Sequence, residues 1–154
     1  MKLSKNFTLS EFLFSDTANR RGISNTPNRE HLVALTALSI NIMQPIREHY
    51  HKGVIITSGY RSGQLNSAIG GSVTSQHSKG EACDFTVPGE DVYETCMWII
   101  EGSGLDFDQL IYEVKNGVEW IHISHKRLGG NRGDMLTAVV QSDGEAEYTR
   151  GLHR

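Results

Sequence analysis

Two short stretches of the chain combine residue types that bind metal ions. The first, at positions 75–84, reads SQHSKGEACD, and the second, at positions 119–122, reads EWIH. His77 and Asp84 come from the first stretch, and His122 comes from the second. Two neutral imidazoles and one carboxylate are typical protein ligands of a catalytic zinc ion, whose fourth position is left to water. These three residues are therefore the predicted metal ligands.

The second stretch lies in a predicted strand, where side chains alternate between two faces. Glu119 would accept the proton of the water, yet it stands three residues before His122 and would face the other way in a regular strand. For both to reach one ion, Glu119 must lie at a bend or bulge where the strand begins. Ile121 and Ile123 are natural core residues, so His122 belongs on the cleft side and His125 is the weaker ligand candidate.

Length and composition predict one domain over positions 1–154, because the 154 residues are 38% hydrophobic and 21% charged. The net charge of -3 argues against nucleic acid, which would require clustered Lys and Arg. No apolar run has the length of a signal peptide or a membrane span, so we expect synthesis in the cytoplasm and no membrane insertion. Cys83 and Cys96 should be reduced, buried residues.

Three helical segments are predicted. A capping box at Thr8 starts the first, whose end is marked by Gly22. The longest runs from about Arg29 to His49, with a kink near Pro45, and the third runs from Asp91 to Ile100.

Five strands are predicted. They are a buried strand at Val54–Ser58, a strand at Ala82–Val87, a hairpin of Asp108–Val114 and Val118–Ser124 joined by an Asn-Gly turn, and an edge strand at Leu136–Val140. The Gly-, Ser- and Asn-rich segment at 64–75 suits a loop near a site. We therefore expect an α+β fold with a small antiparallel sheet packed by helices.

Alternation also orients Asp84 within its strand. Cys83, Phe85 and Val87 share one face, and Asp84 lies on the other. A carboxylate in an otherwise apolar strand is costly unless a positive group compensates it, which favours a functional role.

The motifs S-x-H-x-x-G-x-A-x-D and E-W-x-H resemble the zinc signature of peptidase family M15, the D-Ala-D-Ala metallopeptidases. The fold of that family is shared with lysostaphin-type enzymes and the hedgehog signalling domain. The segment Ser58–Ser62 is also similar to the family, and the resemblance covers roughly Pro27 to Ser124. The small size and the opening segment Phe7–Phe12 resemble the phage and prophage members.

The resemblance implies one zinc ion held by His77, Asp84 and His122, with Glu119 as general base and then general acid. It also implies that three further residues contact the substrate. For two of them an ordinary structural role is the alternative. Arg61 would bind the scissile carbonyl oxygen or a substrate carboxylate, Ser75 would line the cleft or simply form a turn, and Trp120 would stack on the substrate or merely pack.

The implied function is hydrolysis of peptide bonds in peptidoglycan stem peptides or cross-links by a monomeric phage endolysin that is released from the host cytoplasm. Whether the enzyme is a D-Ala-D-Ala carboxypeptidase or an endopeptidase stays open. Two alternatives remain: a zinc-binding module without catalysis, and a phage structural protein that only binds the cell wall.

Overall fold

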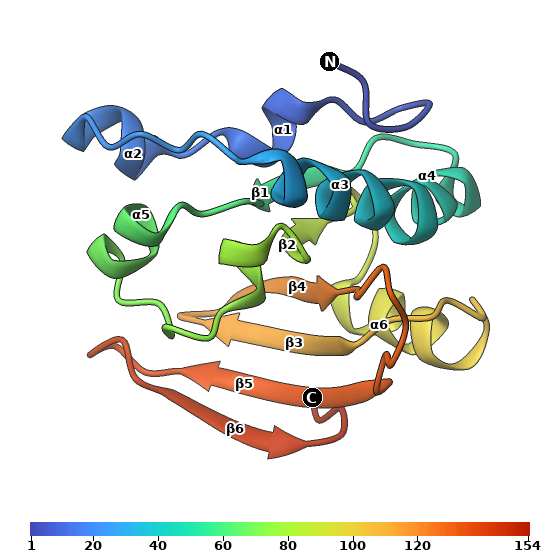
Figure 1. Ribbon diagram of the computed structural model, residues 1–154. Helices are drawn as coiled ribbons and strands as arrows, with labels where there is room; N and C mark the ends of the chain where they lie inside the picture. Colours follow the sequence, from blue (N-terminus) through green and yellow to red (C-terminus); the bar gives the residue numbers. More distant parts are fainter.

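A six-stranded mixed sheet forms the centre of the computed structural model, which describes residues 1–154 (Figure 1). Its strands lie in the order β1-β2-β4-β3-β5-β6. Their bounds are β1 (Ile55–Ser58), β2 (Ala82–Thr86), β3 (Gln109–Lys115), β4 (Val118–Ser124), β5 (Asp134–Val140) and β6 (Ala146–Arg150). All neighbours are antiparallel except β3 and β5, which are parallel. The predicted α+β class is confirmed, with one parallel pair in a mainly antiparallel sheet.

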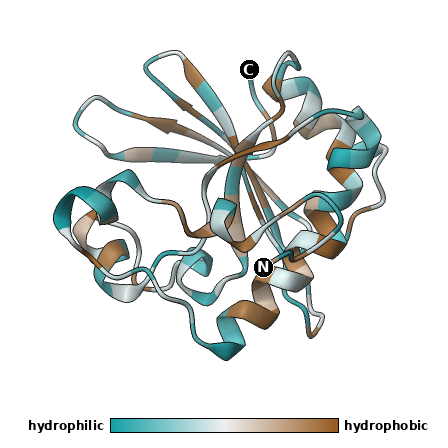
Figure 2. Cartoon of the chain, turned by 90° about the horizontal axis from the view of Figure 1, so that it is seen from above, coloured by the Kyte–Doolittle hydropathy of each residue, from teal (hydrophilic) through white to brown (hydrophobic).

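Helices lie around this sheet and carry both hydrophobic and hydrophilic stretches (Figures 1 and 2). They are α1 (Leu9–Leu13), α2 (Asp16–Arg21), α3 (Arg29–Leu38), α4 (Gln44–Tyr50), α5 (Gly63–Ala68) and α6 (Val92–Glu101), with a π-helical segment η1 (Ser39–Met43) and a 3₁₀ turn η2 (Gln76–Lys79). None of the helices is long and apolar enough to cross a membrane.

The first predicted helix is divided in two. Its capping box is confirmed, because the backbone N–H of Thr8 donates to the carboxylate of Glu11 at 2.6 Å. However, Phe14 is extended, and Ser15 caps a second helix by accepting the N–H of Ala18. The single helix expected up to Gly22 is therefore wrong, although Gly22 does end α2 in the left-handed region.

The longest predicted helix is confirmed as the continuous run α3-η1-α4. Near its middle the turns widen, and the N–H of Gln44 donates to the carbonyl of Ser39, five residues earlier. Proline has no N–H and crowds the carbonyl four residues before it, so a widened turn just before Pro45 relieves the clash without ending the helix.

The two faces of the sheet differ in chemistry because side chains alternate along each strand. One face packs against the helices with the core residues Cys83, Phe85, Leu110, Tyr112, Ile121 and Ile123. The opposite face carries Asp84, Ile111, Glu113, Trp120 and His122, which line a cleft. The predicted orientations of Asp84 and His122 are confirmed. Both cysteines are free and buried, as predicted.

Three predictions about the outer parts of the fold are wrong. The predicted buried strand Val54–Ser58 is the edge strand β1, in which Ile55 is 52% exposed. The segment 64–75, expected as a loop, contains most of α5, because Ser62 caps that helix and Leu65 is buried beneath it. The expected edge strand Leu136–Val140 is interior, since β6 follows it and pairs along it.

Candidate metal centre and substrate cleft

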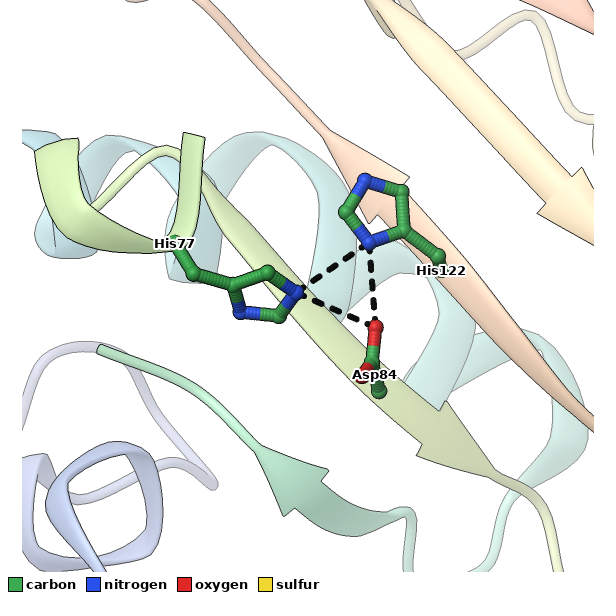
Figure 3. Close-up of side chains that lie close together, drawn as sticks. All are labelled: His77, Asp84 and His122. Carbon is green, nitrogen blue, oxygen red and sulfur yellow. Dashed lines mark hydrogen bonds and ion pairs between the residues drawn. The ribbon is translucent and has the colours of Figure 1, made fainter. Parts of the chain in front are cut away.

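Three side chains from different elements point toward one another on the open face of the sheet (Figure 3). His77 comes from η2, Asp84 from β2 and His122 from β4, and Asp84 and His122 are paired across the two strands. Nε2 of His77 lies 3.2 Å from Nδ1 of His122 and 3.3 Å from Oδ1 of Asp84. Nδ1 of His122 lies 3.0 Å from the same oxygen. The three residues are buried.

The size of this triangle fits a zinc ion. Zinc bound tetrahedrally at about 2.0 to 2.1 Å places its ligand atoms roughly 3.3 Å apart. The three separations of 3.2, 3.3 and 3.0 Å are close to that value. The cluster could therefore hold one ion with only small adjustments, and it leaves room for a further ligand on the cleft side.

The hydrogen bonding of His77 also favours a cation. Its Nδ1 lies 2.8 Å from the carbonyl oxygen of Gly59, which can only accept, so Nδ1 carries the proton. In the neutral ring Nε2 then has a lone pair, and that lone pair faces the carboxylate of Asp84. Two acceptors at this distance repel each other unless a cation or proton lies between them. An outer hydrogen bond that fixes the tautomer of a ligand histidine is usual at metal sites.

The local sequence explains how His77 reaches the site. The hydroxyl of Ser75 accepts the backbone N–H of His77 at 3.2 Å and so begins the turn η2. Gly80 ends that turn with a φ of +74°, and a Cβ there would lie 2.6 Å from the carbonyl oxygen of His31. Glycine is therefore required at this position, which connects η2 to β2.

Arg61 lies beside the candidate metal ligands. Its Nη2 is 3.6 Å from Oδ2 of Asp84, and its Nε donates to the hydroxyl of Ser58 at 3.2 Å. Burial lowers the pKa of Arg61, while Asp84 and Glu113 act in the opposite direction. Burial alone would raise the pKa of Asp84, but its contacts with His77 and His122 hold it well below its usual value. Asp84 is therefore an anionic candidate for a metal ligand.

A cleft of about 730 Å³ opens over the triangle. Six of the seven residues predicted for the site line it, namely Arg61, Ser75, His77, Asp84, Trp120 and His122. The loop between α5 and η2 forms one wall, with Gly70, Gly71, Ser72 and Thr74. Most of the lining is polar, as expected for a surface that binds the backbone of a peptide.

Glu119 is the one predicted residue that the structure does not bring to the site. The pairing of β3 with β4 is regular from Val118 to Ile123, so the bulge that would turn Glu119 inward is absent. Glu119 consequently lies on the helical side of the sheet, where its charge acts on Cys96 of α6 and on Arg154. The expectation that Glu119 bends into the cleft is wrong.

Glu113 supplies the acid on the cleft side instead. It lines the cleft from β3 and is paired with Trp120 of β4. On this face of the sheet the neighbouring pair is Ile111 and His122. Burial and the negative charge of Asp84 raise its pKa to about 7, and the positive groups His122 and Arg61 partly oppose this. A carboxyl group with a pKa near neutrality can both accept and donate a proton.

The sequence contained a signal for Glu113. The Asn116-Gly117 turn has two residues, both with positive φ, and it joins paired Lys115 and Val118. Counting back from that turn pairs Glu113 with Trp120. Because directly paired residues share a face, Glu113 could have been assigned to the face of Trp120 and His122.

The comparison with known families agrees with this site. A family model described as Peptidase M15 matches residues 5–124. The chain belongs to the peptidase M15 family. No curated protein matches the sequence. Membership in peptidase M15 confirms the resemblance noted in the two motifs and supports a metallopeptidase with a peptide substrate. The match includes all the residues predicted for the site as well as Glu113, and it ends at Ser124, before β5 and β6.

Proposed function

We propose that the protein is a zinc-dependent peptidase that hydrolyses peptide bonds of peptidoglycan. The observation that carries this proposal is the triangle of His77, Asp84 and His122, whose dimensions suit zinc and which lies in a chain of the peptidase M15 family. A bound zinc ion would lower the pKa of a water molecule and polarise the carbonyl group that is attacked. His77 and His122 would supply neutral nitrogen ligands, and Asp84 an anionic oxygen.

Glu113 is the proposed general base and acid. It faces the cleft next to the row that holds His122, and no other glutamate lines the cleft. As a carboxylate it would take a proton from the attacking water, and as a carboxylic acid it would give that proton to the leaving amine. This role replaces the one expected for Glu119, which lies on the other side of the sheet.

Arg61 is proposed to bind the carbonyl oxygen that becomes negatively charged during the reaction. Its guanidinium is held by Ser58 and Asp84, and its side chain is only 15% exposed. A fixed, desolvated positive group stabilises such an oxygen without having to reorganise. Trp120 and Ser75, which line the same cleft, are proposed to contact the peptide on either side of the reacting bond.

We further propose a role in bacterial lysis, as a phage or prophage endolysin. This finer proposal rests on the segment Phe7–Phe12, which resembles the phage members of the family. The bond that is cut would be identified by mass spectrometry of the muropeptides released from purified sacculi.

The test of the mechanism compares two glutamates that lie six residues apart. Glu113→Gln should lower the rate of amino-group release from sacculi by at least about 100-fold, as expected for the loss of a general base. It should still bind one zinc ion per chain, since Glu113 is not among the three ligand residues. Glu119→Gln, the matched control, should stay within about threefold of the unmodified protein.

If Glu119→Gln lowered the rate of amino-group release strongly and Glu113→Gln did not, the general base would be Glu119 and not Glu113. A protein that binds zinc but releases no amino groups from sacculi, while sedimenting with them, would instead be a wall-binding module without catalysis.

A further inference from the structure

The last two strands extend the sheet beyond the part of the chain that matches the family. β5 joins the outer edge of β3, and β6 pairs with β5, so the hairpin lies next to the strand that carries Glu113 (Figure 1). The match to the family ends at residue 124, and the hairpin begins at residue 134. The hairpin therefore lies outside the residues that match the family.

Pairing aligns one residue of each strand in a single row on the cleft face. Trp120 is paired with Glu113, Glu113 with Ala138, and Ala138 with Tyr148. Directly paired residues point to the same side of a sheet. The row therefore runs from the aromatic ring of Trp120 across Glu113 to the ring of Tyr148, on the same face as the metal ligands.

The small side chain in this row makes room for the tyrosine. Ala138 is fully buried between Glu113 and Tyr148, although it lies on an open face of the sheet. Tyr148 lines the cleft together with Glu113 and Asp84, yet it is 58% exposed. Tyr148 thus lies next to the buried alanine and still presents a surface that a ligand can contact.

The phenol group is suited to donate a hydrogen bond. Burial raises the pKa of Tyr148, and the negative charges of Glu113 and Asp84 add to that effect. The hydroxyl consequently keeps its proton at neutral pH. The groups that accept such a bond in a peptide are its carbonyl and carboxylate oxygens.

We propose that Tyr148 is a substrate-binding residue, whose hydroxyl donates a hydrogen bond to an oxygen of the bound peptide about four residues away from the bond that is cut. β6 lies three strands from β4, or roughly 14 Å at a spacing of about 4.8 Å. An extended peptide advances about 3.4 Å per residue, so about four residues span that gap. The proposal rests on the proposed peptidase function.

The effect should be on binding rather than on the chemical step, because the contact lies away from the reacting atoms. With purified soluble muropeptides as substrate, Tyr148→Phe should lower kcat/KM about fivefold through a higher KM, with kcat unchanged. This is the loss expected for one hydrogen bond. Tyr148→Ala, which also removes the ring, should lower kcat/KM further, and its zinc content should equal that of the unmodified protein.

Glu147→Gln serves as the control, because Glu147 is exposed, adjoins Tyr148 on the same strand and points to the opposite face. It should leave KM and kcat unchanged. A loss of kcat/KM smaller than twofold in Tyr148→Phe would overturn the proposal.

Sedimentation with purified sacculi separates this proposal from the peptidase function on which it rests. An unmodified protein that binds sacculi without hydrolysing them would contradict the peptidase function. In that case weaker sedimentation of Tyr148→Phe would still support the contact, and equal sedimentation would overturn it.

Discussion

At the scale of single residues, His77 is held from two directions before any metal is bound. Its backbone N–H is accepted by Ser75, and its Nδ1 donates to the carbonyl oxygen of Gly59. Gly59 is itself confined, because a Cβ at this position would lie 2.4 Å from the backbone oxygen of Phe12. The N–H of the next residue, Tyr60, donates to that same oxygen. The position of His77 thus depends on a close contact between the backbones of Gly59 and Phe12.

Gly59→Ala should therefore disturb both the fold and the metal site. Since the new methyl group would meet backbone rather than a flexible side chain, we expect a loss of about 1 to 3 kcal/mol in the free energy of unfolding, and weaker zinc binding because the partner of His77 moves. Urea unfolding and zinc titration would measure the two effects.

Gly63→Ala is the matched control. Gly63 begins α5 and does not have a positive φ, and a Cβ added to it would meet no atom within 4 Å. The alanine should therefore be neutral or slightly stabilising. Equal behaviour of the two variants would contradict the importance of the contact at Gly59.

Also at this scale, the sequence predicted the three metal-binding candidates but misplaced the acid. The orientations of Asp84 and His122 follow from alternation, because the residues on either side of each are apolar core residues. Glu119 was assigned from its motif although alternation in β4 opposed it, and the regular pairing with β3 agrees with alternation. Tyr148 could not have been found, since its position depends on the pairing of two strands far along the chain.

At the scale of elements, the segment between β4 and β5 is fixed by one buried carboxylate. Asp108 is fully buried just before β3 and accepts hydrogen bonds from Nε and Nη2 of Arg132 at 3.0 and 2.9 Å, with Nζ of Lys126 at 3.6 Å. All three residues line one end of the cleft. The strand β5, which is the first strand of the β5–β6 hairpin, begins just after this cluster. The cluster therefore fixes where the hairpin starts.

Asp108→Asn should destabilise the protein in a pH-dependent way. Although burial raises the pKa of Asp108, its bonds with Arg132 outweigh that effect and lower it to about 2, against about 3.9 in an unfolded chain. The carboxylate thus contributes stability above about pH 4, and this contribution is lost as the pH falls toward about 2. Urea unfolding should give a loss of about 2 kcal/mol for the variant at about pH 7.

Asp16→Asn provides the comparison, because Asp16 forms an exposed pair with Arg20 and should cost no more than about 0.5 kcal/mol. An Asp108→Asn variant that matched it at neutral pH would contradict the structural role of the buried cluster.

Helices and strands with a clear local signal in the sequence could be predicted, and those without one could not. The hairpin of β3 and β4 was predicted because an Asn-Gly turn fixes its register, and α6 because its apolar residues recur at helical intervals before Gly102. α5 was missed because its sequence GQLNSA is polar and only Leu65 shows its buried side. The parallel pairing of β3 with β5 has no local signal, since a Gly-rich connection precedes β5.

At the scale of the whole molecule, the sheet divides two tasks between its faces. One face is covered by helices and carries the hydrophobic core, and the other is open and carries the metal-binding candidates and the cleft. Because two of the three ligand residues sit on neighbouring strands, a bound ion would link β2, β4 and the turn η2. Metal binding should consequently be coupled to the stability of the fold.

Zinc should raise the melting temperature of the metal-free protein. At a free concentration of about 100 times Kd, binding contributes roughly 2.7 kcal/mol, which corresponds to about 5 to 10 °C for a domain of this length. The variant His122→Ala should lose this response, and His153→Ala, an exposed histidine, should keep it. Scanning calorimetry with and without zinc would measure the shift, and an equal response of both variants would place the ion elsewhere.

The most direct measurement is the rate at which the protein releases amino groups from purified sacculi before chelation, after removal of metal, and after return of one equivalent of zinc. We expect full loss of activity on chelation, recovery at one equivalent of zinc, and no recovery in His77→Ala, Asp84→Ala or His122→Ala. Activity that survives complete removal of metal, or that returns in those variants, would contradict a zinc peptidase built on these three residues.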